Sequence, residues 1–164
     1  MTKMKIVKHL IPVLLIVTAI TACGAGKQGD KNKEEPLKKE TKVYTISLDQ
    51  AQFLEKVADF KTNPEEWKYL GDKPAIIDFW AEWCVYCRRL SPVLEELAKE
   101  YDGEIYIYKV NTDVEREIAA AFGIRSLPTL LFVPIGQDPQ IVKGAIPKED
   151  LKNVIEEFLL NKAD

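Results

Sequence analysis

The stretch FWAEWCVYCRRLSPVL, residues 79–94, holds two cysteines three positions apart, Cys84 and Cys87, between two different hydrophobic patterns. The residues leading into it, PAIIDFWA (74–81), are almost continuously apolar, which is typical of a strand buried on both faces. After the cysteines the apolar residues recur at helical spacing. We therefore expect a strand that runs directly into a helix, with Cys84 at the helix N-terminus. The packed face of that helix would be Leu90, Val93, Leu94, Leu97 and Tyr101.

This position favours a reactive thiol over the other uses of a cysteine pair. The free N–H groups and the dipole of a helix N-terminus stabilise a thiolate at Cys84, and Cys87 is placed to attack a mixed disulfide formed there. A zinc site normally needs four Cys or His ligands, which are not left once residues 1–22 are removed as described below. A purely structural disulfide across three positions would constrain little chain. We expect redox chemistry, with no metal and no cofactor.

Outward from this stretch, the sequence predicts alternating strands and helices. Before it we expect a short strand at 43–46, a helix over 49–60 with Asp49 as a candidate N-cap, and a loop at 61–73. After it we expect a strand at 104–110, a short helix over 113–124 stopped by Gly123, and a hairpin of strands at 128–134 and 140–145. A last helix would pack through Leu151, Val154, Ile155, Phe158 and Leu159. The order βαβαβαββα indicates an α/β fold with a central mixed sheet flanked by helices.

Several segments, in this order and spacing, resemble the thioredoxin family. They are IIDFWAEWC (76–84), KVNTD (109–113), FGIRSLPTLLF (122–132), KGA (143–145) and the last helix. The resemblance covers nearly all of residues 43–160, and it implies the thioredoxin fold and thiol–disulfide exchange. By position, it implies that Cys84 is the attacking thiol and Cys87 the resolving thiol. A buried acid, Asp78, would lie behind them with Lys109 near it.

The same resemblance implies a surface on which a disulfide substrate docks. The peptide bond before Pro128 would be cis, and Leu127 would pair its backbone with an extended substrate segment. Trp80, Trp83 and Gly144 would line the docking surface. Packing alone is the alternative role for Trp83, and a turn or bulge is the alternative for Gly144.

The chemistry expected of Asp78 also follows from elementary physics. An aspartate inside the apolar run PAIIDFW is costly to bury in its ionised form, so we expect its pKa to rise toward neutrality. Such a group is the best candidate to take the proton of Cys87, because the mature chain contains no histidine. A structural ion pair with Lys109 is the alternative role.

Two features depart from the family pattern. Val85-Tyr86 replaces the Gly-Pro usual between the cysteines of reducing thioredoxins. Tyr86 keeps a backbone N–H, which we expect to point at the sulfur of Cys84 and to make the protein more oxidising, so the direction of electron flow stays open. The loop at 60–73 is also longer than in a minimal thioredoxin. Its apolar residues, Trp67, Tyr69 and Leu70, are expected to cover the sheet edge or the first helix, with binding of a partner as the alternative.

The N-terminus has the pattern of an export signal. Three lysines precede a short apolar run that ends in small residues, and the run is too short to span a membrane. Residues 20–23, ITAC, resemble the lipobox of bacterial lipoproteins, which implies cleavage before Cys23 and attachment of lipid to its sulfur. An ordinary cleaved signal with an incidental cysteine is the alternative. We expect a signal peptide at 1–22, a lipidated cysteine and flexible charged tether at 23–42, and a thioredoxin-like domain at 43–164.

Charge and composition argue against some classes of partner and mechanism. Removing the three lysines of residues 1–22 leaves 20 basic residues against 26 acidic ones, a net charge of −6, which argues against nucleic acid. The only histidine, His9, leaves with the same segment, so Cys–His and Ser–His mechanisms are excluded.

The sequence as a whole predicts a membrane-anchored thiol–disulfide oxidoreductase of the bacterial cell envelope, in the periplasm or on the outer face. It would reduce or isomerise disulfides of exported proteins and draw electrons from an upstream thiol donor. The alternatives are a disulfide-forming oxidase and a non-catalytic tethered module that binds peptides beside Pro128.

Overall fold

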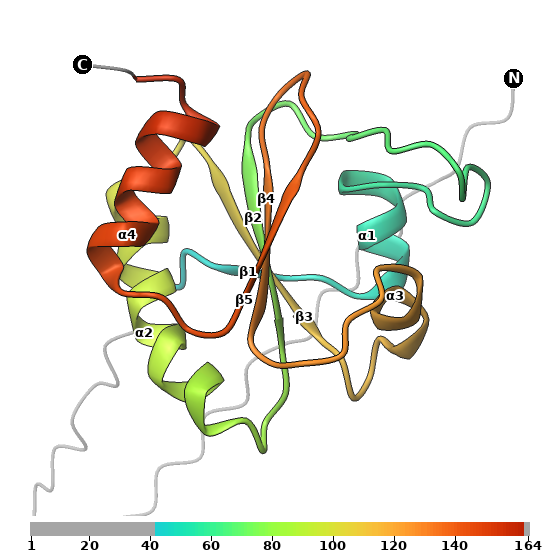
Figure 1. The fold of residues 1–164 in the computed structure, drawn as a ribbon, viewed down its shortest axis with the longest axis horizontal. Helices are drawn as coiled ribbons and strands as arrows, with labels where there is room; N and C mark the ends of the chain where they lie inside the picture. Colours follow the sequence, from blue (N-terminus) through green and yellow to red (C-terminus); the bar gives the residue numbers. More distant parts are fainter. Residues whose placement is uncertain (1–41, 163–164) are drawn as a thin grey trace, which may run out of the picture. The chain divides into compact units, whose positions relative to one another are not determined.

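A mixed five-stranded sheet lies at the centre of the part of the chain that the structure, a computed structural model, describes, residues 42–162 (Figure 1). The strands lie side by side in the order β1-β3-β2-β4-β5. The elements are β1 Ile46–Ser47, α1 Gln50–Lys56, β2 Ala75–Trp80, α2 Val85–Glu100, β3 Tyr106–Asn111, α3 Arg116–Ala121, β4 Thr129–Val133, β5 Gln140–Lys143 and α4 Lys148–Asn153. A π-helical segment, η1 Val154–Leu159, continues α4. The predicted order βαβαβαββα and the thioredoxin fold are confirmed.

The sheet combines parallel and antiparallel pairing. Strands β1, β3 and β2 run parallel, whereas β4 is antiparallel to both β2 and β5. Strand β2 is the middle strand and is buried from Ala75 to Phe79, which explains its continuous apolar sequence. The strand register pairs Asp78 of β2 with Lys109 of β3.

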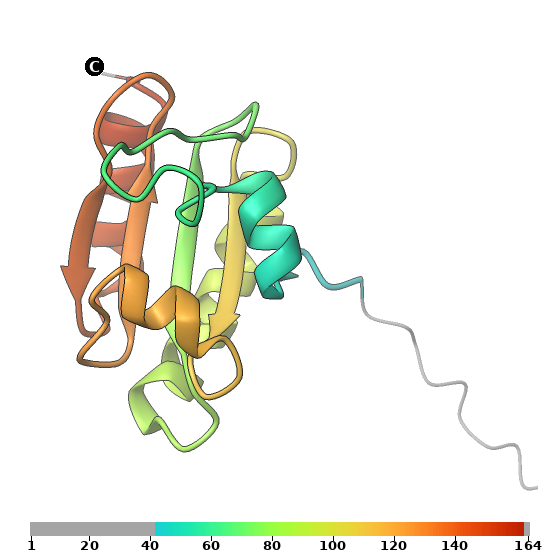
Figure 2. The same cartoon turned by 90° about the vertical axis from the view of Figure 1, so that its right-hand side faces the viewer.

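Helices cover both faces of the sheet. Helices α1 and α3 lie on one face and α2 and α4 on the other (Figures 1 and 2). A hydrophobic core lies on each face of the sheet. Alternate residues of β2 pack into one core or the other, because successive side chains of a strand point to opposite faces. Ile76 packs in the core beneath α2 and α4, whereas Ile77 and Phe79 pack in the core beneath α1 and α3. The same alternation places Asp78 on the α2 side.

Local sequence signals set several element ends. Asp49 caps α1 as predicted, in a capping box with Gln52. Helix α3 ends just before Gly123, which takes a positive φ of 61° that glycine adopts without strain. The π-helical continuation of α4 was not anticipated from the sequence.

The long loop covers the core beneath α1 and α3. Trp67 and Tyr69 pack against that core, and the Trp67 ring meets Phe122 edge-on. The Tyr69 hydroxyl donates to the carbonyl of Lys73 across 2.7 Å. Leu70 donates its backbone N–H to Val57 at the end of α1, but its side chain stays exposed. The expected covering role therefore holds for Trp67 and Tyr69 and is wrong for the Leu70 side chain.

The proposed export segment is not part of the described structure. The signal peptide at 1–22, Cys23 and the tether up to residue 41 lie outside the described residues. Within residues 42–162, no helix combines the length and the apolar character needed to cross a bilayer.

Candidate active site

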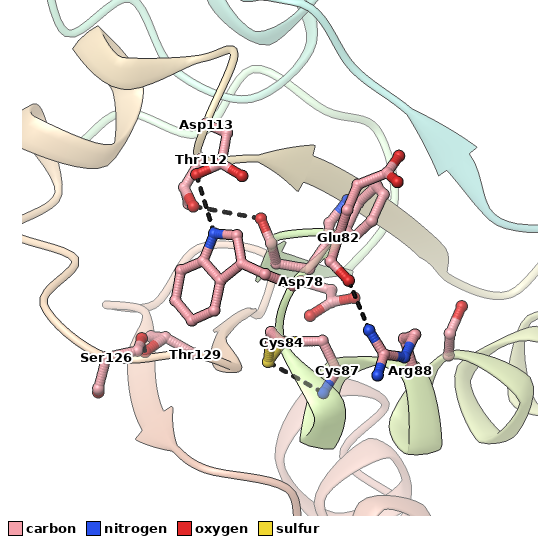
Figure 3. Close-up of a disulfide and its surroundings, with 12 residues drawn as sticks. Asp78, Glu82, Cys84, Cys87, Arg88, Thr112, Asp113, Ser126 and Thr129 are labelled. Atoms are coloured by element: carbon pink, nitrogen blue, oxygen red, sulfur yellow. Dashed lines mark hydrogen bonds between the residues drawn. A yellow bond between two sulfur atoms is a disulfide. The ribbon is translucent and has the colours of Figure 1, made fainter.

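The cysteine pair lies at the start of α2, shortly after the end of β2. Cys84 and Cys87 form a disulfide, and both are buried, with 4% and 2% of their surface exposed (Figure 3). Cys84 is the N-cap of α2, and its Sγ accepts a hydrogen bond from the backbone N–H of Cys87 across 3.1 Å. The placement of Cys84 at the helix N-terminus is confirmed. The structure assigns the N–H···S bond to Cys87, so the expectation that Tyr86 supplies it is wrong.

Asp78 is the buried acid of the site. Its side chain is fully buried, and Lys109 Nζ lies 2.8 Å from its Oδ2. Its Oδ1 has no hydrogen-bond partner within the described structure. Burial raises the pKa of Asp78 above its ordinary value, although the nearby charge and hydrogen bond of Lys109 oppose that rise. The expected partner and the expected direction of the pKa shift are both present.

Exposed apolar side chains surround the cysteine pair. Trp83 is 67% exposed, and its indole Nε1–H donates to Asp113 Oδ1 across 3.2 Å (Figure 3). Val85 and Tyr86 are also exposed. Large apolar side chains left in water beside a reactive group are characteristic of a surface that contacts partners. Trp80 is half-buried, with Lys109 Nζ 5.2 Å from the centre of its ring.

The segment before β4 completes the surface. The Leu127–Pro128 peptide bond is cis, and Leu127 is half-buried. The N–H of Gly144, whose φ is 90°, donates to the carbonyl of Pro128 across 2.8 Å, which brings β5 to this segment. Within residues 42–162, no hydrogen bond uses the backbone N–H or C=O of Leu127. Its backbone can therefore pair with an added strand.

A comparison with family models matches residues 44–157 to the model described as Thioredoxin. The chain belongs to the thioredoxin family. The match includes every site residue named above, from Asp78 to Gly144, and it begins after the segment expected to be a signal and tether.

Individual thioredoxins are similar to this chain over the same domain. The thioredoxin of Borreliella burgdorferi is 46% identical over 113 residues, which are 69% of this chain and 96% of that protein. Thioredoxin 1 of Nostoc sp. is 46% identical over 54% of this chain and 83% of its own length. The chloroplastic thioredoxin M-type of Spinacia oleracea is 44% identical, over 59% and 55%. The crystal structure of chloroplastic thioredoxin z matches with a TM-score of 0.59 at 23% identity, covering 71% of this chain and 96% of that one, which supports the fold.

As a thioredoxin-family protein, the chain is a thiol–disulfide oxidoreductase with a redox-active disulfide, Cys84–Cys87. The family implies disulfide-containing proteins as substrates and a thiol reductant as the electron donor. Within residues 42–162, no group of three or more His, Cys, Asp or Glu residues is arranged to hold a metal ion.

The structure adds residues to this thioredoxin site that sequence reasoning missed. Ser91 Oγ lies 3.3 Å from Lys109 Nζ, and Asp113 holds the Trp83 indole. The Thr129 hydroxyl donates to the carbonyl of Ser126 next to the cis bond (Figure 3). Ser91 had a signal in the sequence, because it follows Cys87 by four positions and so shares its helix face. Asp113 had none, because its contact depends on how two loops meet.

Proposed function

We propose that the chain reduces or isomerises disulfides of exported proteins while a lipid on Cys23 holds it to a membrane. The observation that supports the chemistry is the position of Cys84, which caps α2 and accepts the Cys87 N–H at its sulfur, above the buried Asp78. The observation that supports the location is the segment of residues 1–23, a basic head, a short apolar run and ITAC.

In the reductive direction, the reaction begins with the thiolate of Cys84. It attacks one sulfur of a substrate disulfide, the substrate S–S bond breaks, and a mixed disulfide forms on Cys84. The other substrate sulfur leaves as a thiolate and takes a proton from water. The helix N-terminus and the Cys87 N–H stabilise the Cys84 thiolate and so raise the fraction of the enzyme ready to attack.

The second step resolves the mixed disulfide. The Cys87 thiol gives its proton to the carboxylate of Asp78, and the resulting thiolate attacks Cys84 Sγ. The Cys84–Cys87 disulfide forms and the second substrate thiolate is released, so two electrons have passed to the substrate. The raised pKa of Asp78 suits this role, since a base works best when its pKa is close to the working pH. An upstream dithiol then returns the enzyme to its reduced form.

Docking would precede both steps. The free backbone of Leu127 is placed to pair with an extended segment of the substrate, and Pro128 and Gly144 hold that segment of the enzyme in place. The exposed Trp83 would cover the apolar part of the substrate. These contacts use backbone and apolar surface, so they suit many exported proteins rather than one sequence.

Insulin reduction tests the chemistry. With dithiothreitol as electron donor, the full-length protein should precipitate the insulin B chain, and Cys84→Ser should abolish this activity. Cys87→Ser should accumulate mixed disulfides that can be identified by mass spectrometry. Both directions can be compared in a glutathione buffer set to the redox potential of the cell envelope. If the protein oxidises a reduced, unfolded substrate faster than it reduces insulin, the oxidase alternative is favoured.

The N-terminus of the mature protein tests the location. Mass spectrometry should find a chain that begins at an acylated Cys23 and partitions into detergent. Cys23→Ser should release the protein from the membrane fraction while leaving insulin reduction by the purified protein intact. A mature chain that begins elsewhere and carries no lipid would rule out the anchor.

A further inference from the structure

Lys109 joins the helix that carries the cysteines to the strand that carries the buried acid. From β3, its Nζ lies 2.8 Å from Asp78 Oδ2 on β2 and 3.3 Å from Ser91 Oγ on α2. The Lys109 side chain is only 11% exposed, so these two oxygens account for most of its polar environment. The Lys109–Asp78 ion pair is thus tied to α2 through one hydroxyl group.

Ser91 shares a helix face with the resolving cysteine. Residues four apart on a helix lie one turn above each other, so Ser91 follows Cys87 on the face that packs toward the sheet. Glu95 follows Ser91 by another four residues. The Glu95 carboxylate accepts hydrogen bonds from the backbone of Tyr44 and Thr45, so it is already engaged at the start of the domain.

Other carboxylates lie near Lys109 and could attract its ammonium group. Burial disfavours the charged form of Glu95, but the hydrogen bonds from residues 44–45 and the charge of Lys109 hold the pKa of Glu95 below its ordinary value. An open hollow of about 310 Å³ is lined by Lys109 together with Trp80, Asp49 and Glu115. Without the Ser91 hydroxyl, water in the hollow and the carboxylates of Asp49 and Glu115 would draw the ammonium away from Asp78.

We propose that Ser91 is a positioning residue for disulfide exchange: its hydroxyl holds the Lys109 ammonium against α2 and in contact with the Asp78 carboxyl. This inference rests on the proposed role of Asp78 as the base for Cys87. The positive charge of Lys109 favours the ionised carboxylate, so Ser91 acts by keeping Asp78 able to accept a proton at lower pH.

The direction of the effect follows from the geometry. In Ser91→Ala the Lys109 ammonium loses its contact with the Ser91 hydroxyl and shifts toward the open hollow. Burial raises the pKa of Asp78 and the charge of Lys109 lowers it. When the ammonium moves away, its lowering effect weakens, so the titration of Asp78 moves to higher pH. Less carboxylate is then present at pH values within the Asp78 titration, so resolution of the mixed disulfide slows there and is unchanged at pH values above it.

The direct test is titration of the Asp78 carboxyl by ¹³C NMR in the intact protein. Ser91→Ala should move that titration to higher pH, and Ser91→Thr, which keeps the hydroxyl, should restore it. Lys109→Met should move it in the same direction as Ser91→Ala. In the Lys109→Met background, Ser91→Ala should have no further effect, because the group through which Ser91 acts is gone. Thermal unfolding of each variant at one pH gives the purely structural cost.

Three results would overturn the proposal. The first is an Asp78 titration in Ser91→Ala that coincides with the wild type or moves to lower pH. The second is a Ser91→Thr variant that folds but behaves as Ser91→Ala. The third is a Ser91→Ala effect that persists without Lys109. The carboxyl titration needs no enzymatic activity, so it is readable even if the wild type fails to reduce insulin. Conversely, if the wild type reduces insulin but the Asp78 titration is unchanged in Ser91→Ala, only the role of Ser91 is rejected and the proposed function stands.

Discussion

The backbone N–H of Cys87 points at the sulfur of Cys84, 3.1 Å away, so the cysteine proposed to resolve the mixed disulfide supplies a hydrogen bond to the cysteine proposed to attack. The bond follows from Cys84 being the N-cap of α2, because an N-cap side chain accepts from the N–H two or three residues further on. Cys87 is the third. Any non-proline residue at position 87 would provide the same donor. The residues between the cysteines must therefore act on the thiolate in another way.

Replacing Val85-Tyr86 with Gly-Pro is expected to make the protein slightly more reducing. Proline is tolerated in the first turn of a helix, and the Cys87 N–H stays in place. What is lost is the N–H of Tyr86, one of the unpaired amides at the positive end of the helix. We expect a shift to more negative potential, smaller than the roughly 30 mV that corresponds to about 1.4 kcal/mol for a two-electron couple.

A redox titration against glutathione or dithiothreitol, followed by tryptophan fluorescence, measures this shift. Val85→Gly alone is the matched control, because it leaves the N–H of residue 86 in place. A shift toward more oxidising values would show that these two residues do not act through the helix N-terminus.

In the reduced protein, Cys84 should be alkylated before Cys87. Both side chains are buried in the disulfide form, so exposure alone does not separate them. The separation comes from charge, because the thiolate is the reactive species and only Cys84 caps the helix. Timed labelling with iodoacetamide and peptide mapping should show modification of Cys84 first, and none in the disulfide form. Equal labelling rates would contradict the assigned roles.

Much of the fold could be predicted from the sequence because its signals are local. The apolar run of β2, the capping box of Asp49 and the stop at Gly123 each report on a few neighbouring residues, and each is present as expected. The π-helical turn at Val154–Leu159 could not be predicted, since the packed face of the last helix reads the same for either helix type.

The site was predictable to the extent that it repeats the family pattern. Cys84, Cys87, Asp78 and Pro128 lie where the motifs implied. Contacts that lie outside this pattern and join elements distant in sequence were not predictable. The Lys109–Ser91 contact joins residues 18 positions apart, and the Trp83–Asp113 contact joins residues 30 apart. The source of the N–H···S bond was assigned wrongly because the sequence does not show which amide of the first turn faces the sulfur.

Trp83→Ala should impair substrate docking without destabilising the domain. The side chain is largely exposed, so its removal should change the free energy of unfolding by less than about 0.5 kcal/mol. An exposed aromatic at an interface commonly contributes at least ~1 kcal/mol to binding, so KM for insulin should rise by about fivefold or more.

Trp67→Ala is the control for this prediction. Trp67 packs against Phe122 in the long loop, so its truncation should cost about 1–3 kcal/mol of stability and leave KM unchanged. Urea unfolding and insulin kinetics on both variants separate the two roles. An unchanged KM in Trp83→Ala would remove Trp83 from the docking surface.

The stability of the oxidised protein should fall relative to Asp78→Asn as the pH rises. Burial raises the pKa of Asp78 in the folded state, so the folded protein holds this proton at pH values where the unfolded chain has lost it. The stabilisation that comes from the protonated acid is complete below about pH 4, where an unfolded aspartate titrates, and is lost as the pH rises through the folded pKa. Asparagine has no such proton, so the variant lacks this dependence.

Urea unfolding of both proteins from pH 3 to pH 9, with the disulfide intact so that no thiol titrates, measures the difference. The gap in favour of Asp78→Asn should open by about 1.4 kcal/mol for each pH unit between the unfolded and folded pKa values, then become constant. Lys109→Met removes the charge that opposes the pKa rise, so in that background the gap should keep opening to higher pH. A flat gap would mean that the pKa of Asp78 is the same in the folded and unfolded states, and a gap that closes with rising pH would mean that folding lowers this pKa. Asp78 would then be the carboxylate of a structural ion pair, unable to take the proton of Cys87.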